Sequence, residues 1–285
     1  MGSPVPSPVN TVAFPHSLQP VGVFDSGVGG LTVAAALRRR LPSEQLLYLG
    51  DVARLPYGTK SPETVVRYAG KATDFLAARG IKMLVVACNT ASAHALDTLA
   101  SVHSGLAVLG VVEAGAAAAA RQSRSGRIVV AATEGTCRSA AFVRAIRAHR
   151  PDAEVIQVPC PMFVALAEEG LTEGPIAEAM VHHYLGDYFR GGAAADCLVL
   201  GCTHFPLLAG TLRRVLGDGP ALVDCAEAVA AEAETVLAAA GLAAPPEGAG
   251  GLSLIATDAP DRFARIASRL FPALGAVPAV ELANL

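Results

Sequence analysis

Two cysteines stand where an apolar run ends and a helical pattern begins. Cys88 lies in LVVACNTAS and Cys202 in LVLGCTHFP, each followed by polar residues. A thiolate can act as a nucleophile or take a proton. A thiol of pKa about 8.5 is only about 3% ionised at pH 7, so forming the thiolate costs about 2 kcal/mol. Because the amide groups of a helix start favour negative charge, we expect lowered thiol pKa values at both positions.

A single buried cysteine is more often a small apolar core residue than a reactive group. Two cysteines at matching places, each with polar residues after it, favour a functional role instead. A metal site built from Cys197, Cys202 and His204 fits no common zinc spacing, so we expect no metal. The other cysteines have no matching counterpart and are interpreted as core or surface residues: Cys137, Cys160, Cys197 and Cys225.

A glycine-rich loop, FDSGVGG (24–30), follows the first apolar run and leads into a helix. Its backbone amides could bind an anion, yet it lacks the last glycine of GxGxxG and the lysine of a P-loop, so nucleotide binding is weakly supported. Asp25 in this loop could receive an ammonium group or assist a proton transfer, although a helix-capping role is the common alternative. His204 could orient the Cys202 thiol or exchange protons with it.

Composition narrows the class of protein. The chain has 285 residues, 52% hydrophobic and 16% charged, with a net charge of −3. This length favours two domains, and the near-neutral charge argues against a nucleic-acid partner. Six cysteines are too few for a disulfide scaffold, and we expect neither a membrane segment nor a secretory signal. A cytoplasmic protein with free thiols and a disordered tail over residues 1–20 is the consistent prediction.

Short apolar runs alternate with helical patterns from residue 21 onward. Runs of Val, Ile and Leu without polar alternation are typical of buried parallel strands, so an α/β fold with right-handed crossovers is predicted. The clearest helix runs from Ser61, a capping residue, to Gly80. Strands are predicted at residues 21–24, 46–49, 83–87, 107–112, 128–132, 154–158, 198–200, 221–223 and 252–256.

The two halves of the chain repeat a similar spacing. Positions that follow strands at 25, 51, 88 and 113 are separated by 26, 37 and 25 residues, and those at 133, 159, 202 and 227 by 26, 43 and 25. Any regular βα chain gives such periods, but a cysteine after the third strand of each half favours a duplication. Two such units facing each other would form a cleft at the C-terminal ends of their strands.

Five segments together resemble the glutamate racemases, a branch of the cofactor-independent aspartate/glutamate racemase superfamily. The Cys-Asn-Thr segment is typical of the superfamily, and the Cys-Thr-His-Phe-Pro segment of the glutamate branch. The segments are GVFDSGVGGLTV (22–33), YLGDVARLPYGTKS (48–61), VVACNTASA (85–93), TEGTCRS (133–139) and LVLGCTHFPLL (198–208).

The resemblance implies two similar, pseudo-symmetric α/β domains that face each other across a cleft. The first would be discontinuous, residues 21–112 plus 229–285, with residues 113–228 forming the second. The resemblance also implies an isomerase that interconverts L- and D-glutamate without a cofactor, supplies D-glutamate for peptidoglycan synthesis and cell shape, and acts as a cytoplasmic homodimer.

The same resemblance implies roles for individual residues. The cysteine matching Cys88 removes the α-proton of D-glutamate, the one matching Cys202 removes that of L-glutamate, and each thiol reprotonates the opposite face. Asp25 and His204 match residues that assist the two thiols. The implied substrate-binding residues are Asp25, Ser26, Tyr57, Gly58, Asn89, Thr90, Thr133, Thr136, Glu168, Thr203 and His204.

Three other functions stay open on the residues alone. A racemase acting on aspartate or a hydantoin would share the fold, but His204 argues against it. A non-catalytic module that binds an amino acid or dicarboxylate would tolerate the loss of one cysteine, and both are present. A thiol hydrolase would need one cysteine with a histidine partner and would leave the second cysteine unexplained.

Overall fold

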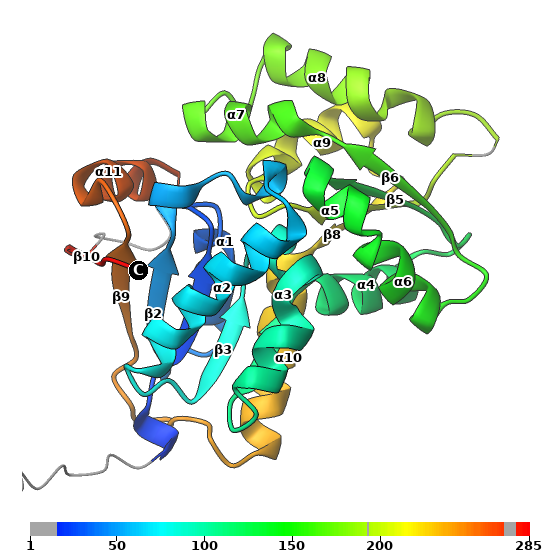
Figure 1. Cartoon of the computed structure of the whole chain (residues 1–285). Helices are drawn as coiled ribbons and strands as arrows, with labels where there is room; N and C mark the ends of the chain where they lie inside the picture. The colour runs from blue at the N-terminus through cyan, green and yellow to red at the C-terminus, as the bar shows by residue number, and fades with distance from the viewer. Residues whose placement is uncertain (1–15, 193, 271–277) are drawn as a thin grey trace, which may run out of the picture.

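The computed structural model describes residues 16–192, 194–270 and 278–285. Figure 1 shows two α/β units side by side: the blue, cyan, orange and red parts of the chain form the first unit, and most of the green part forms the second. The tail expected over residues 1–20 lies mostly outside the described residues. Within the described part of it, the short 3₁₀ helix η1 (His16–Leu18) precedes the first strand.

The first unit is built on sheet A, whose six strands run parallel in the order β10-β9-β2-β1-β3-β4. Every residue of β1 and β3 is buried, as expected of strands covered by helices on both faces. The strands are β1 (Val21–Asp25), β2 (Gln45–Gly50), β3 (Met83–Val86), β4 (Ala107–Gly110), β9 (Gly251–Ala256) and β10 (Val280–Leu282).

The second unit is built on sheet B, four parallel strands in the order β6-β5-β7-β8. This order repeats β2-β1-β3-β4 of sheet A, so the duplication predicted from spacing corresponds to a repeated topology. The predicted α/β fold with two similar parallel-sheet units is thus confirmed. The strands are β5 (Arg127–Ala132), β6 (Glu154–Pro159), β7 (Cys197–Gly201) and β8 (Ala221–Asp224).

The C-terminal part of the chain returns to the first unit. β9 pairs with β2 from Gln45↔Gly251 to Gly50↔Ala256, and β10 pairs with β9. Two helices connect the units, α4 (Val111–Gln122) after β4 and α10 (Cys225–Ala239) after β8. The predicted domain boundaries at 112/113 and 228/229 fall inside these helices and stay a prediction.

The connecting helices pack against each other through small side chains. Ala114 and Ala118 of α4 and Ala226 and Ala230 of α10 are buried in one hydrophobic cluster that also contains strand residues of both sheets. The approach is so close that a Cβ added to Gly115 would lie 2.4 Å from Sγ of Cys225. The two units therefore share a continuous core along these helices.

The remaining helices cover the sheets. The predicted capping of α2 is confirmed, since the Ser61 hydroxyl accepts from the Thr64 amide at 3.3 Å; the helix ends at Ala77, and Gly80 follows with φ +72°. In the part of the chain that the structure describes, no helix is both long and apolar enough to cross a membrane. The helices that cover the sheets are α1 (Leu31–Arg40), α2 (Pro62–Ala77), α3 (Asn89–Val102), α5 (Glu134–Ser139), α6 (Ala141–His149), α7 (Pro161–Glu169), α8 (Pro175–Leu185), α9 (Ala209–Leu216) and α11 (Pro260–Leu270).

Candidate active site

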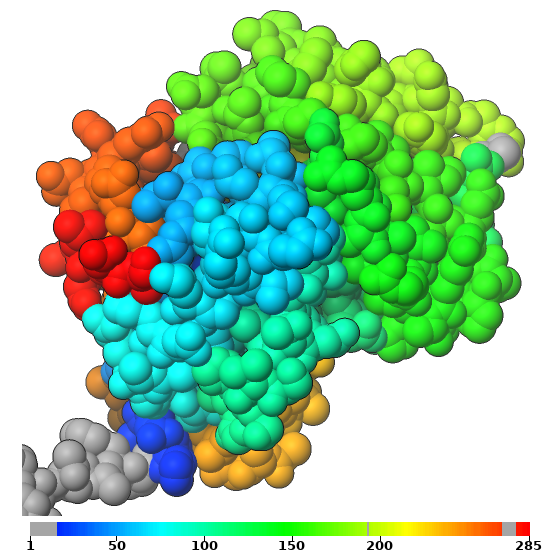
Figure 2. Space-filling model, viewed as in Figure 1, coloured from blue at the N-terminus to red at the C-terminus, as the bar shows by residue number. Residues whose placement is uncertain are grey.

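The C-terminal ends of the central strands of both sheets bring the candidate residues together. Asp25 ends β1, Cys88 follows β3, Thr133 follows β5, and Cys202 follows β7. Figure 2 shows the surfaces of the two units meeting along a continuous boundary, where blue and cyan residues of the first unit adjoin green residues of the second. The candidate site therefore has one cysteine from each unit.

Cys88 is the N-cap residue of α3, as the sequence predicts. Its Sγ accepts a hydrogen bond from the Ala91 amide at 3.4 Å, and its thiol donates one to the Ser26 hydroxyl oxygen at 3.5 Å. The predicted lowering of its pKa is nevertheless wrong for this structure. Burial and the charge of Asp25 raise the pKa of Cys88 to about 12, although the two hydrogen bonds act in the opposite direction. Loss of solvation outweighs the helix start.

Cys202 has a different local environment, and the prediction that it opens a helix is wrong. It follows β7, but the chain then turns, and the 3₁₀ helix η5 (Phe205–Leu208) begins only three residues later. The main partner of its thiol is the His204 ring, with 3.7 Å between Sγ and Nδ1. At Cys202 the His204 side chain is thus the partner of the thiol, whereas at Cys88 a backbone amide of the helix start has that role.

His204 links Cys202 to a carboxylate of the second unit. Its Nε2 lies 3.2 Å from Oε1 of Glu168 on α7, close enough for an ion pair but not aligned for a hydrogen bond. Burial lowers the pKa of His204, but Cys202 and Glu168 together outweigh it and raise the pKa to about 10. The contact with His204 also lowers the pKa of Glu168, against the effect of its partial burial. At neutral pH the pair is therefore imidazolium and carboxylate.

Asp25 and Asn89 present buried acceptor atoms without a donor. Oδ2 of Asp25 accepts from the Gly27 amide at 2.9 Å, but its Oδ1 and Oδ1 of Asn89 have no hydrogen-bond partner among the described residues. Burial raises the pKa of Asp25 above its usual value, while the nearby His204 lowers it. Buried polar atoms are normally paired, so these two oxygens mark a place suited to a ligand that donates hydrogen bonds.

Three threonine hydroxyls join the units beside Cys88. Thr90 of α3 lies 3.1 Å from Thr133 and 3.2 Å from Thr136 between hydroxyl oxygens, and Thr133 and Thr136 are 3.0 Å apart. Thr133 is also the N-cap residue of α5, where its hydroxyl accepts from the Thr136 amide at 3.3 Å. Hydroxyls can both donate and accept, so this group can rearrange around a ligand carboxylate.

The segment at Tyr57 and Gly58 reaches the same threonines through its backbone. A Cβ added to Gly58 would lie 2.8 Å from Cβ of Thr133, so only glycine allows this approach. The ring of Tyr57 is buried in the first unit, 6.0 Å from the ring of Phe24 between centroids, and its hydroxyl donates to Oδ2 of Asp51 at 2.6 Å. Through these two contacts, Tyr57 anchors the segment that carries Gly58 to the core of the first unit.

Across the site, the loop after β1 lies against the loop after β7. In the first turn of α1, which follows this loop, the Thr32 hydroxyl donates to the carbonyl of Thr203 at 3.2 Å. A Cβ added to Gly29 would lie 2.5 Å from Oγ1 of Thr203 and 2.7 Å from the His204 ring. Contacts and charge effects of this kind connect most of the predicted site residues into neighbouring clusters at one edge of the two sheets. These residues are Asp25, Ser26, Gly58, Cys88, Thr90, Thr133, Thr136, Glu168, Cys202, Thr203 and His204.

Asp51 is a buried residue that stands out in the sequence only by its place in the repeated spacing. Besides Tyr57, its oxygens accept from the Thr257 hydroxyl at 2.9 Å and from the Arg54 guanidinium at 3.3 Å. Its place directly after β2, close to the position of Asp25 at the end of β1, is the signal that could have identified it. Asp51 ties the Tyr57 segment to the returning C-terminal part of the chain.

The described residues contain no group of three or more His, Cys, Asp or Glu side chains arranged to hold a metal ion. Cys197 begins β7 and Cys202 follows its end. The length of β7 therefore separates Cys197 from Cys202, two of the three residues considered above as metal ligands.

Comparison with known proteins gives a consistent set of relatives. A sequence profile of the family Asp/Glu/Hydantoin racemase matches residues 31–233. A glutamate racemase of Geobacter metallireducens is 47% identical over 249 residues, which is 87% of this chain and 91% of the relative.

Two solved structures resemble the whole fold. Glutamate racemase from Thermus thermophilus, in complex with beta-chloro-D-alanine, has a TM-score of 0.84 at 43% identity and covers 94% of this chain and 98% of its own. Glutamate racemase from Francisella tularensis, in complex with D-glutamate, has a TM-score of 0.86 at 30% identity with the same coverage of both chains.

Proposed function

Because this chain belongs to the Asp/Glu/hydantoin racemase family, we propose that the reaction it catalyses is the interconversion of L- and D-glutamate. The chain is an isomerase of the racemase class. The observation that carries the choice of reaction is the pair Cys88 and Cys202, one from each unit, each with its own polar partners. Inverting a carbon centre by proton transfer requires an acid and a base on opposite faces, which two thiols from facing units can supply.

In this mechanism the two thiols hold opposite protonation states. Cys88 as thiolate removes the α-proton of D-glutamate while the Cys202 thiol delivers a proton to the other face, and the roles reverse for L-glutamate. The Ala91 amide would stabilise the Cys88 thiolate by the hydrogen bond that it already donates, and the Ser26 hydroxyl would do so by turning its own proton toward the sulfur once the thiol is ionised. The His204 imidazolium, held by Glu168, would do so for Cys202.

The substrate's charges explain how a buried thiol can ionise. Asp25 raises the pKa of Cys88 through its negative charge. The free oxygens of Asp25 and Asn89 are suited to the substrate ammonium, which would neutralise Asp25 and remove that effect. Binding of glutamate would thus lower the pKa of Cys88 when its thiolate is needed.

The carboxylates of the substrate find donors on both sides of the site. The hydroxyls of Thr90, Thr133 and Thr136 lie beside Cys88, and Thr203 lies beside Cys202. The carbanion formed at the α-carbon would be stabilised by such fixed donors. Ser26 and the backbone at Tyr57 and Gly58 complete the substrate-binding set, and every proton is carried by a side chain, so no cofactor is required.

We further propose that the enzyme acts in the cytoplasm as a homodimer and supplies D-glutamate for peptidoglycan synthesis. These points rest on the sequence resemblance to glutamate racemases. The association state can be tested by analytical ultracentrifugation, in which a single species at the monomer mass would contradict the dimer.

The reaction can be tested in D₂O with purified protein and L-glutamate, without added cofactor, beside L-aspartate. We expect the α-proton signal to disappear from the NMR spectrum and the circular dichroism to decay for glutamate alone. Reaction of aspartate instead would contradict the substrate. Binding without exchange on either amino acid would favour the non-catalytic module.

A further inference from the structure

Helix α11 of the first unit lies beside α7 of the second, at the edge of the candidate site. α11 follows β9 in sheet A, whereas α7 follows β6 in sheet B. Figures 1 and 2 show the orange α11 reaching toward the light green α7. A pocket of about 110 Å³ lies between them, lined by apolar residues that include Val28 and Phe263 and by the charged residues Glu168, Asp258 and Arg262.

Arg269 fixes the C-terminal end of α7. Its Nη2 donates a hydrogen bond to the backbone carbonyl of Glu168. Its guanidinium lies over Gly170, where an added Cβ would be 3.6 Å from Cζ. The last carbonyls of a helix lack donors within the helix, and a cation at that end is favoured by the helix dipole. Arg269 therefore holds the turn of α7 that carries Glu168.

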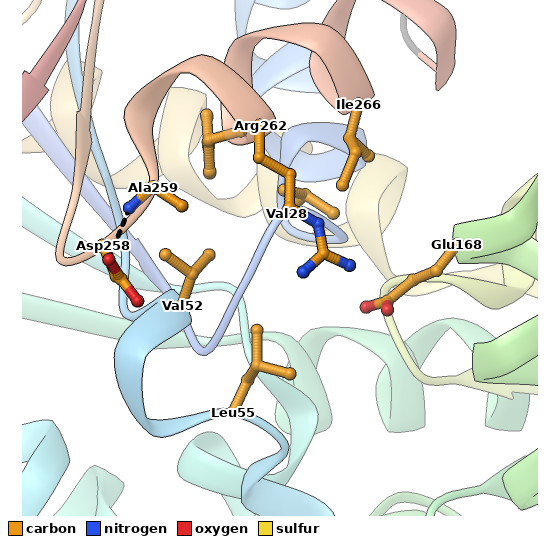
Figure 3. A pocket seen from close by; sticks show the side chains of 9 residues that line it. Val28, Val52, Leu55, Glu168, Asp258, Ala259, Arg262 and Ile266 are labelled. Atoms are coloured by element: carbon orange, nitrogen blue, oxygen red, sulfur yellow. Dashed lines mark hydrogen bonds between the residues drawn. The ribbon is translucent and has the colours of Figure 1, made fainter.

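Arg262 faces the carboxylate of the same residue. It lies seven residues before Arg269, two helical turns along the same side of α11. Figure 3 shows its guanidinium and the Glu168 carboxylate pointing toward each other in the pocket, while the carboxylate of Asp258 lies on the other side. The charge of Arg262 contributes to the lowered pKa of Glu168, after the larger effect of His204.

Glu168 in turn contacts His204 at 3.2 Å, and His204 contacts the thiol of Cys202 at 3.7 Å. We propose that Arg262 and Arg269 are positioning residues: from the first unit they hold Glu168 of the second, so that His204 keeps its carboxylate partner beside Cys202. This inference rests on the proposed racemase function. It makes the reactivity of Cys202 depend on the contact between α11 and α7.

The test compares steady-state racemisation of L-glutamate by the full-length wild type and by Arg262→Gln, Arg269→Gln and the double variant. We expect kcat to fall about five- to tenfold in the double variant, the size of a coupling between neighbouring charged groups. KM should change by less than about twofold, since neither arginine contacts the threonine hydroxyls or the thiols. Lysine at both positions should restore most of kcat, because lysine keeps the charge and a donor.

Arg265→Gln is the matched control, since Arg265 is exposed on the same helix and makes no hydrogen bond or ion pair with the described residues. It should retain wild-type kcat. The decisive comparison is the Glu168→Gln background, in which the arginine substitutions should have no further effect. An unchanged kcat in the double variant, or an equal loss with and without Glu168→Gln, would overturn the inference.

Thermal unfolding of each variant separates loss of positioning from loss of folding. The arginines are exposed, so we expect midpoints close to that of Arg265→Gln. A loss of kcat that tracks a lowered midpoint and is not restored by lysine would also overturn the inference. A wild type that fails to racemise glutamate would instead overturn the proposed function, and this inference with it.

Discussion

The two candidate thiols lie in different surroundings. Cys88 is a buried N-cap residue beside a carboxylate, and Cys202 is a buried residue beside a protonated imidazole. The two sites are thus equivalent in topology but opposite in local charge. In the proposed mechanism each thiol must both gain and lose a proton, so this difference would have to be balanced when the substrate binds.

Replacement of either thiol should remove the reaction. We expect Cys88→Ala and Cys202→Ala each to lower racemisation by about a thousandfold or more, the range for loss of a general acid or base. Circular dichroism with L-glutamate and with D-glutamate measures the loss in both directions. Cys137→Ala is the matched control, because Cys137 is a half-buried cysteine outside the proposed proton path. Full turnover by either single variant would refute the two-thiol mechanism.

The raised pKa of Cys88 predicts slow alkylation of the unliganded protein. With a pKa of about 12, the thiolate fraction at pH 7 to 10 is small and rises roughly tenfold per pH unit. Iodoacetamide labelling of Cys88, followed by peptide mass spectrometry, should show this slope. Asp25→Asn removes a neighbouring negative charge and should speed labelling at pH 8. A plateau below pH 9 in the wild type would show that the pKa is not raised.

The residue types of the candidate site were predictable from the sequence, but their electrostatics were not. The cysteines, Asp25 and His204 stand in recognisable segments after apolar runs. The pKa of Cys88 depends on burial and on Asp25, which lies 63 positions away in the sequence. Such effects arise only when strands distant in sequence become neighbours, as β1 and β3 do in sheet A.

At the scale of elements, the loops that follow the strands make close contacts between the two units around the candidate site. The loop after β1 approaches the loop after β7 at Gly29, and the Gly58 segment approaches Thr133. Both contacts use a glycine whose missing Cβ makes room for a side chain of the other unit. The close approach of the two units at these loops therefore depends on the absence of a single Cβ atom at each glycine.

Gly29→Ala should disturb the site without breaking the fold. The added Cβ would lie 2.5 Å from Oγ1 of Thr203 and 2.7 Å from the His204 ring, so these groups must move, at a cost of about 1–3 kcal/mol. We expect kcat to fall clearly at temperatures where the variant is still fully folded, because the displaced groups belong to the candidate site. Gly27→Ala is the comparison within the same loop, since its Cβ would meet nothing closer than Leu55 at 3.8 Å. Equal effects of the two variants would contradict this explanation.

Sequence patterns predicted the nine longer strands within one or two residues. The signal is strongest for β1, β3 and β7, in which every residue is buried. β4 ends at Gly110 rather than at 112, since Val111 and Val112 already belong to α4. β10 was missed because it has only three residues and lies at the exposed edge of sheet A. The helix expected directly after Cys202 was wrong because apolar periodicity cannot distinguish a turn from the first turn of a helix.

At the scale of the whole molecule, the return of the chain to the first unit determines which parts meet. It places β9 beside β2, and it brings α11 next to α7 at the edge of the site. The repeat in sequence spacing predicted two similar units, but no local pattern indicated that α11 would bridge them. Contacts between the units depend on the packing of α4 and α10 and are not encoded in any one segment.

A buried ion pair fixes this return at the other end of sheet A. Nζ of Lys82 lies 2.6 Å from Oε2 of Glu44, and both side chains are almost fully buried. Lys82 also donates to the carbonyls of Ser17 at 2.6 Å and Leu242 at 2.8 Å, and Glu44 accepts from the Ala244 amide at 2.7 Å. One pair thereby joins the segment before β1, the start of β3 and the connection from α10 to β9.

Lys82→Met should therefore weaken the fold while leaving the chemistry intact. Removing one partner leaves the Glu44 carboxylate buried without its counter-charge, which typically costs about 3–5 kcal/mol. Urea unfolding should show that loss, and kcat measured well below the unfolding midpoint should stay near wild type, because the pair lies at the opposite ends of the strands from Cys88. Lys71→Met, at an exposed position of α2, should change the free energy of unfolding by less than about 0.5 kcal/mol. If Lys82→Met instead kept the stability of the wild type and lowered kcat, Lys82 would contribute to catalysis rather than anchor the returning chain.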